Sequence, residues 1–127
     1  MAHLHVYRQR RYVGSALAPS ITVDGKEVAR VGSGRRVIIG LMAGPHTIAS
    51  DDKASAISID AKAGQDYYVR VDETIGFWKG HGKLTMLMPE QGKPEYSLQK
   101  PIEPDRKFAK EMIEYDAGES DQPSTPK

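Results

Sequence analysis

The side chains in this sequence that could bind a metal or attack a substrate are few and widely spaced. Cysteine is absent, so disulfides, thiol catalysis and thiolate metal sites are excluded for this chain. Among the four histidines, only His3 and His5 have the spacing that puts two imidazoles on one face of a strand. A metal site would need further ligands of defensible geometry, which the sequence does not indicate. We therefore expect no metal ion and no other cofactor.

His46 follows the dipeptide Gly44-Pro45 at the entry to an expected strand. We interpret it as a residue that caps this turn through a hydrogen bond. The segment 32–36, GSGRR, superficially resembles a phosphate-binding loop. A Walker loop, however, requires Gly-Lys-Ser/Thr at the start of a helix, and here the glycines lead into a strand. This segment is therefore predicted to be a turn.

No pattern of nucleophile, acid and base is present. The serines lack the G-x-S-x-G context of a nucleophile elbow. The adjacent carboxylates Asp51-Asp52 and Asp72-Glu73 would point to opposite faces of a strand, which is the wrong arrangement for a cooperating acid and base. We expect no catalytic residues and no enzymatic activity. The alternative is a small hydrolase or ligand-processing enzyme whose site these patterns do not reveal.

An aromatic segment lies near the middle of the chain, where Phe77-Trp78 stands between Gly76 and Gly80. Large aromatic side chains on a flexible, glycine-flanked segment are typical anchors in recognition sites. Trp78 could instead plug one end of the core, and we favour this interpretation because it is the only tryptophan. The candidate contact surface joins this segment to the basic cluster near the N-terminus, and comprises Phe77, Trp78, His81, Arg8, Arg10 and Tyr12.

Charge is nearly balanced overall, with 18 Lys and Arg against 17 Asp and Glu, but it is unevenly distributed. Residues 1–36 carry seven basic and two acidic side chains, whereas residues 101–127 carry four and seven. The basic stretch raises nucleic-acid binding as a hypothesis, and the near-neutral net charge argues against it. No apolar run approaches the ~20 residues that span a bilayer, so no transmembrane segment is expected.

Short alternating strands separated by turn residues dominate residues 1–100. Asp24-Gly25 between apolar runs is the strongest local hairpin signal, because a type I′ turn requires positive φ at both central residues. About eight such strands at regular spacing predict an all-β, antiparallel β-sandwich. Alternation within the strands predicts the buried face, whose residues include Ile21, Val23, Ile57, Ile59, Val69 and Val71.

The character of the chain changes after Lys100. Residues 101–117 are predicted to be a proline-flanked connector and a short amphipathic helix, spanning about Asp105 to Tyr115, because apolar residues recur there at helical spacing. An isolated helix of this length is marginally stable, so it should pack on its own sandwich or on a second copy. A homo-oligomer could therefore form through this helix or through edge strands. Residues 118–127 are expected to be a disordered tail.

Several motifs occur in an order that resembles one family over residues 4–100: VYRQRRYVGSA, ITVDGKEVARV, AGPHTI, AGQDYYVRV and GFWKGHGKLTML. This is a bacterial family of small proteins of unknown function, many of them described as lipoproteins. In architecture it looks like PEGA-type and carboxypeptidase-regulatory-like sandwiches. The resemblance implies no catalytic residues.

The same resemblance implies where the protein works and what it contacts. It implies a periplasmic or outer-membrane-associated precursor and a module that contacts proteins or a cell-envelope polymer. This chain shows no export signal or lipobox cysteine before His3. Without export, the protein would be cytoplasmic.

Overall fold

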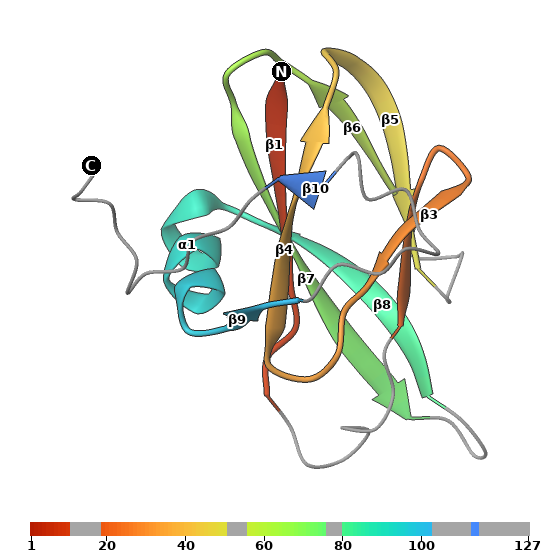
Figure 1. Ribbon diagram of the computed structural model, residues 1–127, viewed down its shortest axis with the longest axis vertical. Helices are drawn as coiled ribbons and strands as arrows, with labels where there is room; N and C mark the ends of the chain where they lie inside the picture. The colour runs from red at the N-terminus through yellow and green to blue at the C-terminus, as the bar shows by residue number, and fades with distance from the viewer. Residues whose placement is uncertain (11–18, 51–55, 76–79, 103–112, 115–127) are drawn as a thin grey trace.

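The computed structural model describes residues 1–10, 19–50, 56–75, 80–102 and 113–114 of the 127-residue chain. These residues form two β-sheets that share one apolar core, with a single helix beside the outer face of the larger sheet (Figure 1). The prediction of a mostly β fold is confirmed, whereas the helix lies elsewhere in the chain than predicted. The elements in chain order are β1 (Ala2–Tyr7), β2 (Ser20–Val23), β3 (Lys26–Arg30), β4 (Arg35–Leu41), β5 (Gly44–Ala49), β6 (Ile57–Ala61), β7 (Asp66–Ile75), β8 (Gly80–Leu87), α1 (Pro89–Ser97), β9 (Lys100–Pro101) and β10 (Ile113–Glu114).

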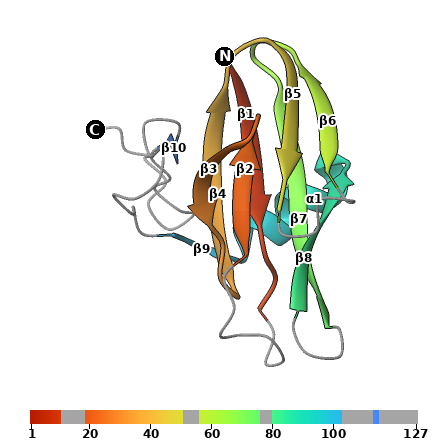
Figure 2. The same ribbon diagram turned by 90° about the vertical axis from the view of Figure 1, so that its right-hand side faces the viewer.

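The larger sheet has the strand order β10-β4-β1-β7-β8, with β9 also pairing with β4, and the smaller sheet has the order β3-β2-β5-β6. Most neighbouring strands are antiparallel, as the turn-rich sequence predicted. Two pairs are parallel: β1 with β7, and β4 with β9. Figure 2 shows the two layers from the side. The N-terminal strand β1 thus lies in the middle of the larger sheet, between β4 and β7.

The β2–β3 hairpin confirms the strongest local prediction. Its turn residues Asp24 and Gly25 have φ values of 52° and 85°. Both central positions therefore occupy the left-handed region, as a type I′ turn requires. This turn matches the natural twist of the strands, so the register between β2 and β3 follows from local sequence. One register shift, between Ile21 and Thr22, interrupts it.

The core lies between the sheets and draws aliphatic side chains from both. Five of the six predicted core residues are buried, and Ile57 is half-buried at the core margin. Strand β4 is apolar on both faces, as expected for a central strand. Its residue Ile38 faces a second, aromatic cluster on the outer face of the larger sheet. Met42, the first residue after this strand, is 71% exposed.

The observed helix is not the predicted one. Helix α1 comes earlier, at Pro89–Ser97, and contains Gly92 and Pro94 in its interior. The expected helix at 105–115 falls mostly outside the described residues, as does the tail. Ile113 and Glu114, however, form strand β10 against β4, which corrects the helix prediction at these two positions.

Residues 76–79 lie outside the described residues. Gly80, His81 and Gly82 pair with Ile75, Thr74 and Glu73 of β7, so β8 is already regular there. Pairing with a long neighbouring strand compensates here for the low strand propensity of glycine.

Candidate functional site

The structure separates the residues of the predicted contact surface. Phe77, Trp78 and Tyr12 lie outside the described residues, so their roles stay predictions. His81 lies in β8, at the end of the β7–β8 ladder that adjoins residues 76–79. Nothing in the described residues brings this position next to the N-terminal arginines.

Arg8 does not belong to an exposed contact surface, because its side chain is only 2% exposed. The backbone explains this correction. The Arg8 N–H donates to the Arg35 carbonyl at 3.0 Å, and the Gly34 N–H donates to the Arg8 carbonyl at 3.0 Å. The chain therefore stays attached to the β4 edge beyond the end of β1, and Arg8 remains within the fold. Arg10, two residues later, is exposed.

Arg10 forms part of an open hollow at the end of β4, which we call the basic depression. Its volume is about 410 Å³. Among the described residues that line it, three side chains are cationic and none is acidic, although the chain as a whole is almost charge-balanced. The lining residues are Gln9, Arg10, Ser33, Gly34, Arg35, Leu98, Gln99 and Lys100.

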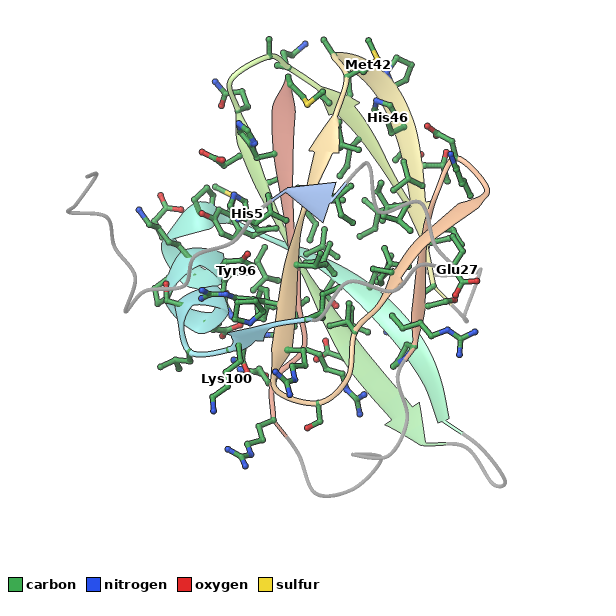
Figure 3. All side chains as sticks on the ribbon, in the orientation of Figure 1. His5, Glu27, Met42, His46, Tyr96 and Lys100 are labelled. Carbon is green, nitrogen blue, oxygen red and sulfur yellow. The ribbon has the colours of Figure 1, made fainter. Side chains whose placement is uncertain are left out.

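Backbone pairing brings the three cations together from distant parts of the sequence. Lys100 is the register partner of Arg35 in the parallel β4–β9 pair, and its N–H donates to the Gly34 carbonyl at 3.0 Å. Arg10 packs over Gly34, where an added Cβ would lie 3.6 Å from the Arg10 Cβ. Figure 3 shows Lys100 at the foot of the sheet, below α1.

The glycine-serine segment in this depression is a turn, as predicted. Gly34 has φ +73°, and the Arg35 N–H donates to the Gly32 carbonyl at 3.1 Å. The Arg35 guanidinium also donates from Nη1 to the Pro101 carbonyl at 3.2 Å. The turn thus fixes the start of β4, and β9 orients the Arg35 side chain. Chemically, the arrangement suits a ligand that carries negative charge.

A second group of polar side chains lies beneath α1 on the outer face of the larger sheet. Figure 3 shows His5 of β1 and Tyr96 of α1 facing one another in this layer. The His5 ring stacks on Tyr68 with centroids 4.5 Å apart and meets Tyr96 edge-on at 5.0 Å. Its Nε2 lies 3.1 Å from Asp66 Oδ1. His5 is thus part of an aromatic layer that attaches the helix to the sheet.

Glu95 of α1 is the acceptor that joins this layer. The Tyr7 hydroxyl donates to Glu95 Oε1 at 2.5 Å, and Arg70 Nη1 donates to the same oxygen at 3.0 Å. Burial raises the pKa of Glu95, but hydrogen bonds from Tyr7, Arg70 and Gln91 outweigh it and leave the pKa below its ordinary value. Burial and the bond to Glu95 raise the pKa of Tyr7, so both groups keep their usual protonation states at neutral pH.

Arg36 ties the end of α1 to β4. Its side chain is 3% exposed, its guanidinium lies 4.8 Å from the centre of the Tyr96 ring, and Nη1 donates to the Tyr96 carbonyl at 3.3 Å. A cation at the C-terminal end of a helix meets unpaired carbonyls and the negative end of the helix dipole. From the sequence, Arg36 was interpreted only as part of a basic surface. In the structure its side chain is buried and bonded within the fold.

His46 caps its turn, as predicted, and also joins two loops. Nδ1 lies 2.7 Å from Asp24 Oδ2, and Nε2 lies 2.7 Å from the Met42 carbonyl. Asp24 Oδ1 accepts the Thr47 N–H at 2.9 Å. Figure 3 shows His46 beneath Met42, at the end of the molecule opposite Lys100. This contact, the His46 clasp, holds the β2–β3 turn against the β4–β5 turn.

The His46 clasp is expected to make stability depend on pH. Two acceptors favour the imidazolium, so the bonds to Asp24 and Met42 raise the pKa of His46, while those from Thr47 and His46 lower the pKa of Asp24. The histidine contribution is complete below the unfolded pKa of about 6.5 and is lost as pH rises through the higher folded value. The aspartate contribution is complete above about 4 and is lost as pH falls through the lower folded value.

Replacement His46→Gln should therefore lower the free energy of unfolding by about 1 kcal/mol near pH 5.5, a modest effect because water screens the half-exposed Asp24. The difference from the unsubstituted protein should shrink toward pH 9. Urea unfolding at pH 5.5 and at pH 9 measures this difference in stability. Lys93→Gln, at an exposed position, is the control. An identical difference at both pH values would contradict the proposed charge on His46.

The described residues contain no cluster of three or more His, Cys, Asp or Glu side chains that could hold a metal ion. Within the same residues, no helix is long and apolar enough to cross a membrane. The features that carry chemistry are thus the basic depression, the layer beneath α1 and the His46 clasp.

Comparison with known protein families now places the chain. A family described as a protein of unknown function, DUF2846, matches residues 1–82. The chain belongs to the DUF2846 family. The match confirms the predicted membership of a family of unknown function. Neither the curated proteins nor the solved structures gave a match to this DUF2846 chain.

The matched region ends inside β8, so α1, β9 and β10 of this DUF2846 protein lie beyond it. The basic depression draws on both parts. Residues 9–10 and 33–35 belong to the matched region, whereas residues 98–100 follow it. Sequence reasoning had singled out Arg10 and Arg35 but missed Leu98, Gln99 and Lys100, because their approach depends on the α1–β9 connection.

Proposed function

We propose that this DUF2846 protein is a non-catalytic, PEGA-like β-sandwich module of the bacterial cell envelope that contacts an anionic protein or surface polymer. The observation that carries this proposal is the basic depression. Three cationic side chains converge there and no acidic one occurs among the described lining residues, on a chain with 18 basic and 17 acidic residues. Such local charge attracts an anionic partner even when net charge is near zero.

The layer beneath α1 supports a non-catalytic role. Its titratable groups lie within hydrogen-bonding distance of one another. Tyr7 and Arg70 both donate to Glu95, and Arg70 also pairs with Asp72. Catalytic groups need a place for substrate between them. Here Tyr7 is fully buried, Tyr96 is 7% exposed, and the bonded partners hold a helix on a sheet. This network therefore stabilises the fold.

Placement in the envelope rests on the resemblance of the sequence motifs to bacterial lipoproteins and to PEGA-type sandwiches. The two-sheet architecture around a shared core fits such a sandwich. Fractionation of cells that express the full native gene would test this placement. Recovery of the protein in the soluble cytosolic fraction alone would contradict it.

Binding to polyanions tests the function. The full chain should bind fluorescent polyphosphate or polyglutamate, and the double variant Arg10→Glu/Lys100→Glu should lose at least about tenfold in affinity through charge repulsion. Fluorescence anisotropy measures the affinity of the unsubstituted chain and of the double variant at low and at high salt. High salt should weaken binding. Lys26→Glu, an exposed charge reversal on β3, serves as the matched control and should retain affinity within about twofold. Absence of binding to both polymers, or equal losses in both variants, would overturn the proposal.

A further inference from the structure

We infer that the basic depression is a binding site for a phosphate ester group, held by Arg10, Arg35 and Lys100. This inference rests on the proposed function and narrows it, because it states which anion the module recognises. Three independent features lead to it: the register of the cations, the geometry of the guanidinium groups, and the size and lining of the depression.

The register places two like charges side by side. Arg35 and Lys100 are direct partners in the β4–β9 pair, and neighbouring strands lie roughly 4.8 Å apart. Like charges at directly paired positions destabilise a sheet. Arg10 adds a third positive charge from above Gly34. An anion bound among these side chains would remove this repulsion, and no described residue of the lining provides a carboxylate that does so.

The charge at the site favours a phosphate monoester over a carboxylate. A guanidinium presents parallel N–H donors that match two oxygens of either group, but a phosphate monoester carries nearly two negative charges at neutral pH and a carboxylate carries one. Arg35 donates from Nη1 to the Pro101 carbonyl at 3.2 Å, which restricts the positions of its guanidinium. A fixed donor loses less conformational entropy on binding than a free one.

The remaining lining suits the organic part of such a ligand. The volume of about 410 Å³ exceeds what a bare phosphate fills and lies in the range of small-ligand sites. Gln9 and Ser33 provide amide and hydroxyl groups, and Leu98 provides an aliphatic side chain that is 81% exposed. A phosphate ester with a polar or apolar substituent would thus find contacts beyond its phosphate.

The experiment compares two anions of equal charge. We expect the full chain to bind linear polyphosphate about tenfold more tightly than polyglutamate of matched charge number, measured by calorimetry at one ionic strength. Arg35→Lys keeps the charge but removes the forked donor, which pairs with phosphate and carboxylate oxygens alike, so it should lower the affinity for both polymers about fivefold. Arg10→Lys repeats the test at a second position, so that loss of the Arg35–Pro101 bond cannot alone explain the result.

The possible outcomes distinguish failure of the phosphate inference from failure of the proposed anion-binding function. Equal affinity for the two polymers would overturn the phosphate inference and leave an anion-binding module, and unchanged affinity in both lysine variants would show that Arg10 and Arg35 do not hold the anion. Binding to neither polymer would overturn both. Thermal unfolding of each variant confirms that the chain still folds.

A second arm identifies the source of the phosphate. Binding to vesicles of phosphatidylcholine with phosphatidylglycerol, but not to phosphatidylcholine alone, would support a lipid headgroup. Leu98→Ser should then weaken vesicle binding without changing polyphosphate binding. Binding to polyphosphate without binding to either vesicle would support a soluble or polymeric phosphate ester.

Discussion

Replacement of Ile59 by alanine is expected to lower the free energy of unfolding by about 2–5 kcal/mol, the usual cost of truncating a buried aliphatic side chain. Ile59 lies on β6, is 3% exposed and belongs to the core cluster between the sheets. Its removal would leave a cavity where residues from both sheets meet. Chemical denaturation with urea measures the change.

The neighbouring position provides the control for Ile59. Asp60 is exposed on the same strand, and Asp60→Ala should change stability by less than about 0.5 kcal/mol. Comparison of the two variants separates loss of core packing from loss of strand structure. A cost below about half a kcal/mol for Ile59→Ala would show that the inner face of β6 does not contribute to the core.

Replacement of Gly92 by alanine should also destabilise the protein, by about 1–3 kcal/mol. In most helices this substitution is stabilising by roughly 0.5–1 kcal/mol, because glycine loses more backbone entropy on folding. Here a Cβ at Gly92 would lie 2.5 Å from the Tyr68 Cβ and 2.8 Å from its Cγ. The helix would have to move away from the sheet, which reverses the sign of the effect.

Lys93→Ala is the matched control for Gly92→Ala, because Lys93 is an exposed position on the same helix. It should change stability by less than about 0.5 kcal/mol. Thermal unfolding with near-ultraviolet circular dichroism follows both stability and the tyrosine environment. A rise in melting temperature for Gly92→Ala would show that α1 does not sit against Tyr68.

Helix α1 shows why part of this fold could not be predicted from sequence. Its segment has Pro89 in the first turn, which is a helix-start signal, but Gly92 and Pro94 follow in the interior. No apolar stripe of the usual spacing is present, and Tyr96 is its one buried apolar side chain in the described structure. The helix is stabilised by contacts with Tyr68, Tyr7 and Arg70, which are distant in sequence.

Two residues near the end of the predicted C-terminal helix show the opposite case. The apolar spacing over about 105–115 predicted a helix, yet Ile113 pairs with Ile39 and lies in a strand. Helical spacing over a short segment is a weak signal, and pairing with the edge of a formed sheet can override it. Residues 105–112 lie outside the described residues, so the helix prediction there stays a prediction.

The sequence by itself determined the features that depend on neighbours along the chain. Asp24-Gly25 set the β2–β3 turn, alternation in β6 and β7 set the buried faces, and Gly44-Pro45 placed His46 at a turn. It also determined family membership through motifs that are largely structural. These features follow from local backbone preference and from side-chain period, which act over a few residues.

Only the tertiary structure decided the candidate site. The basic depression joins residues 9–10, 33–35 and 98–100, and no pattern in the sequence relates these segments. Parallel pairing of β4 with β9 placed Lys100 beside Arg35, while continued attachment to β4 buried Arg8 and left Arg10 exposed. Strand pairing between distant segments depends on the total free energy of the fold, so which arginine lies inside cannot be determined from its neighbours alone.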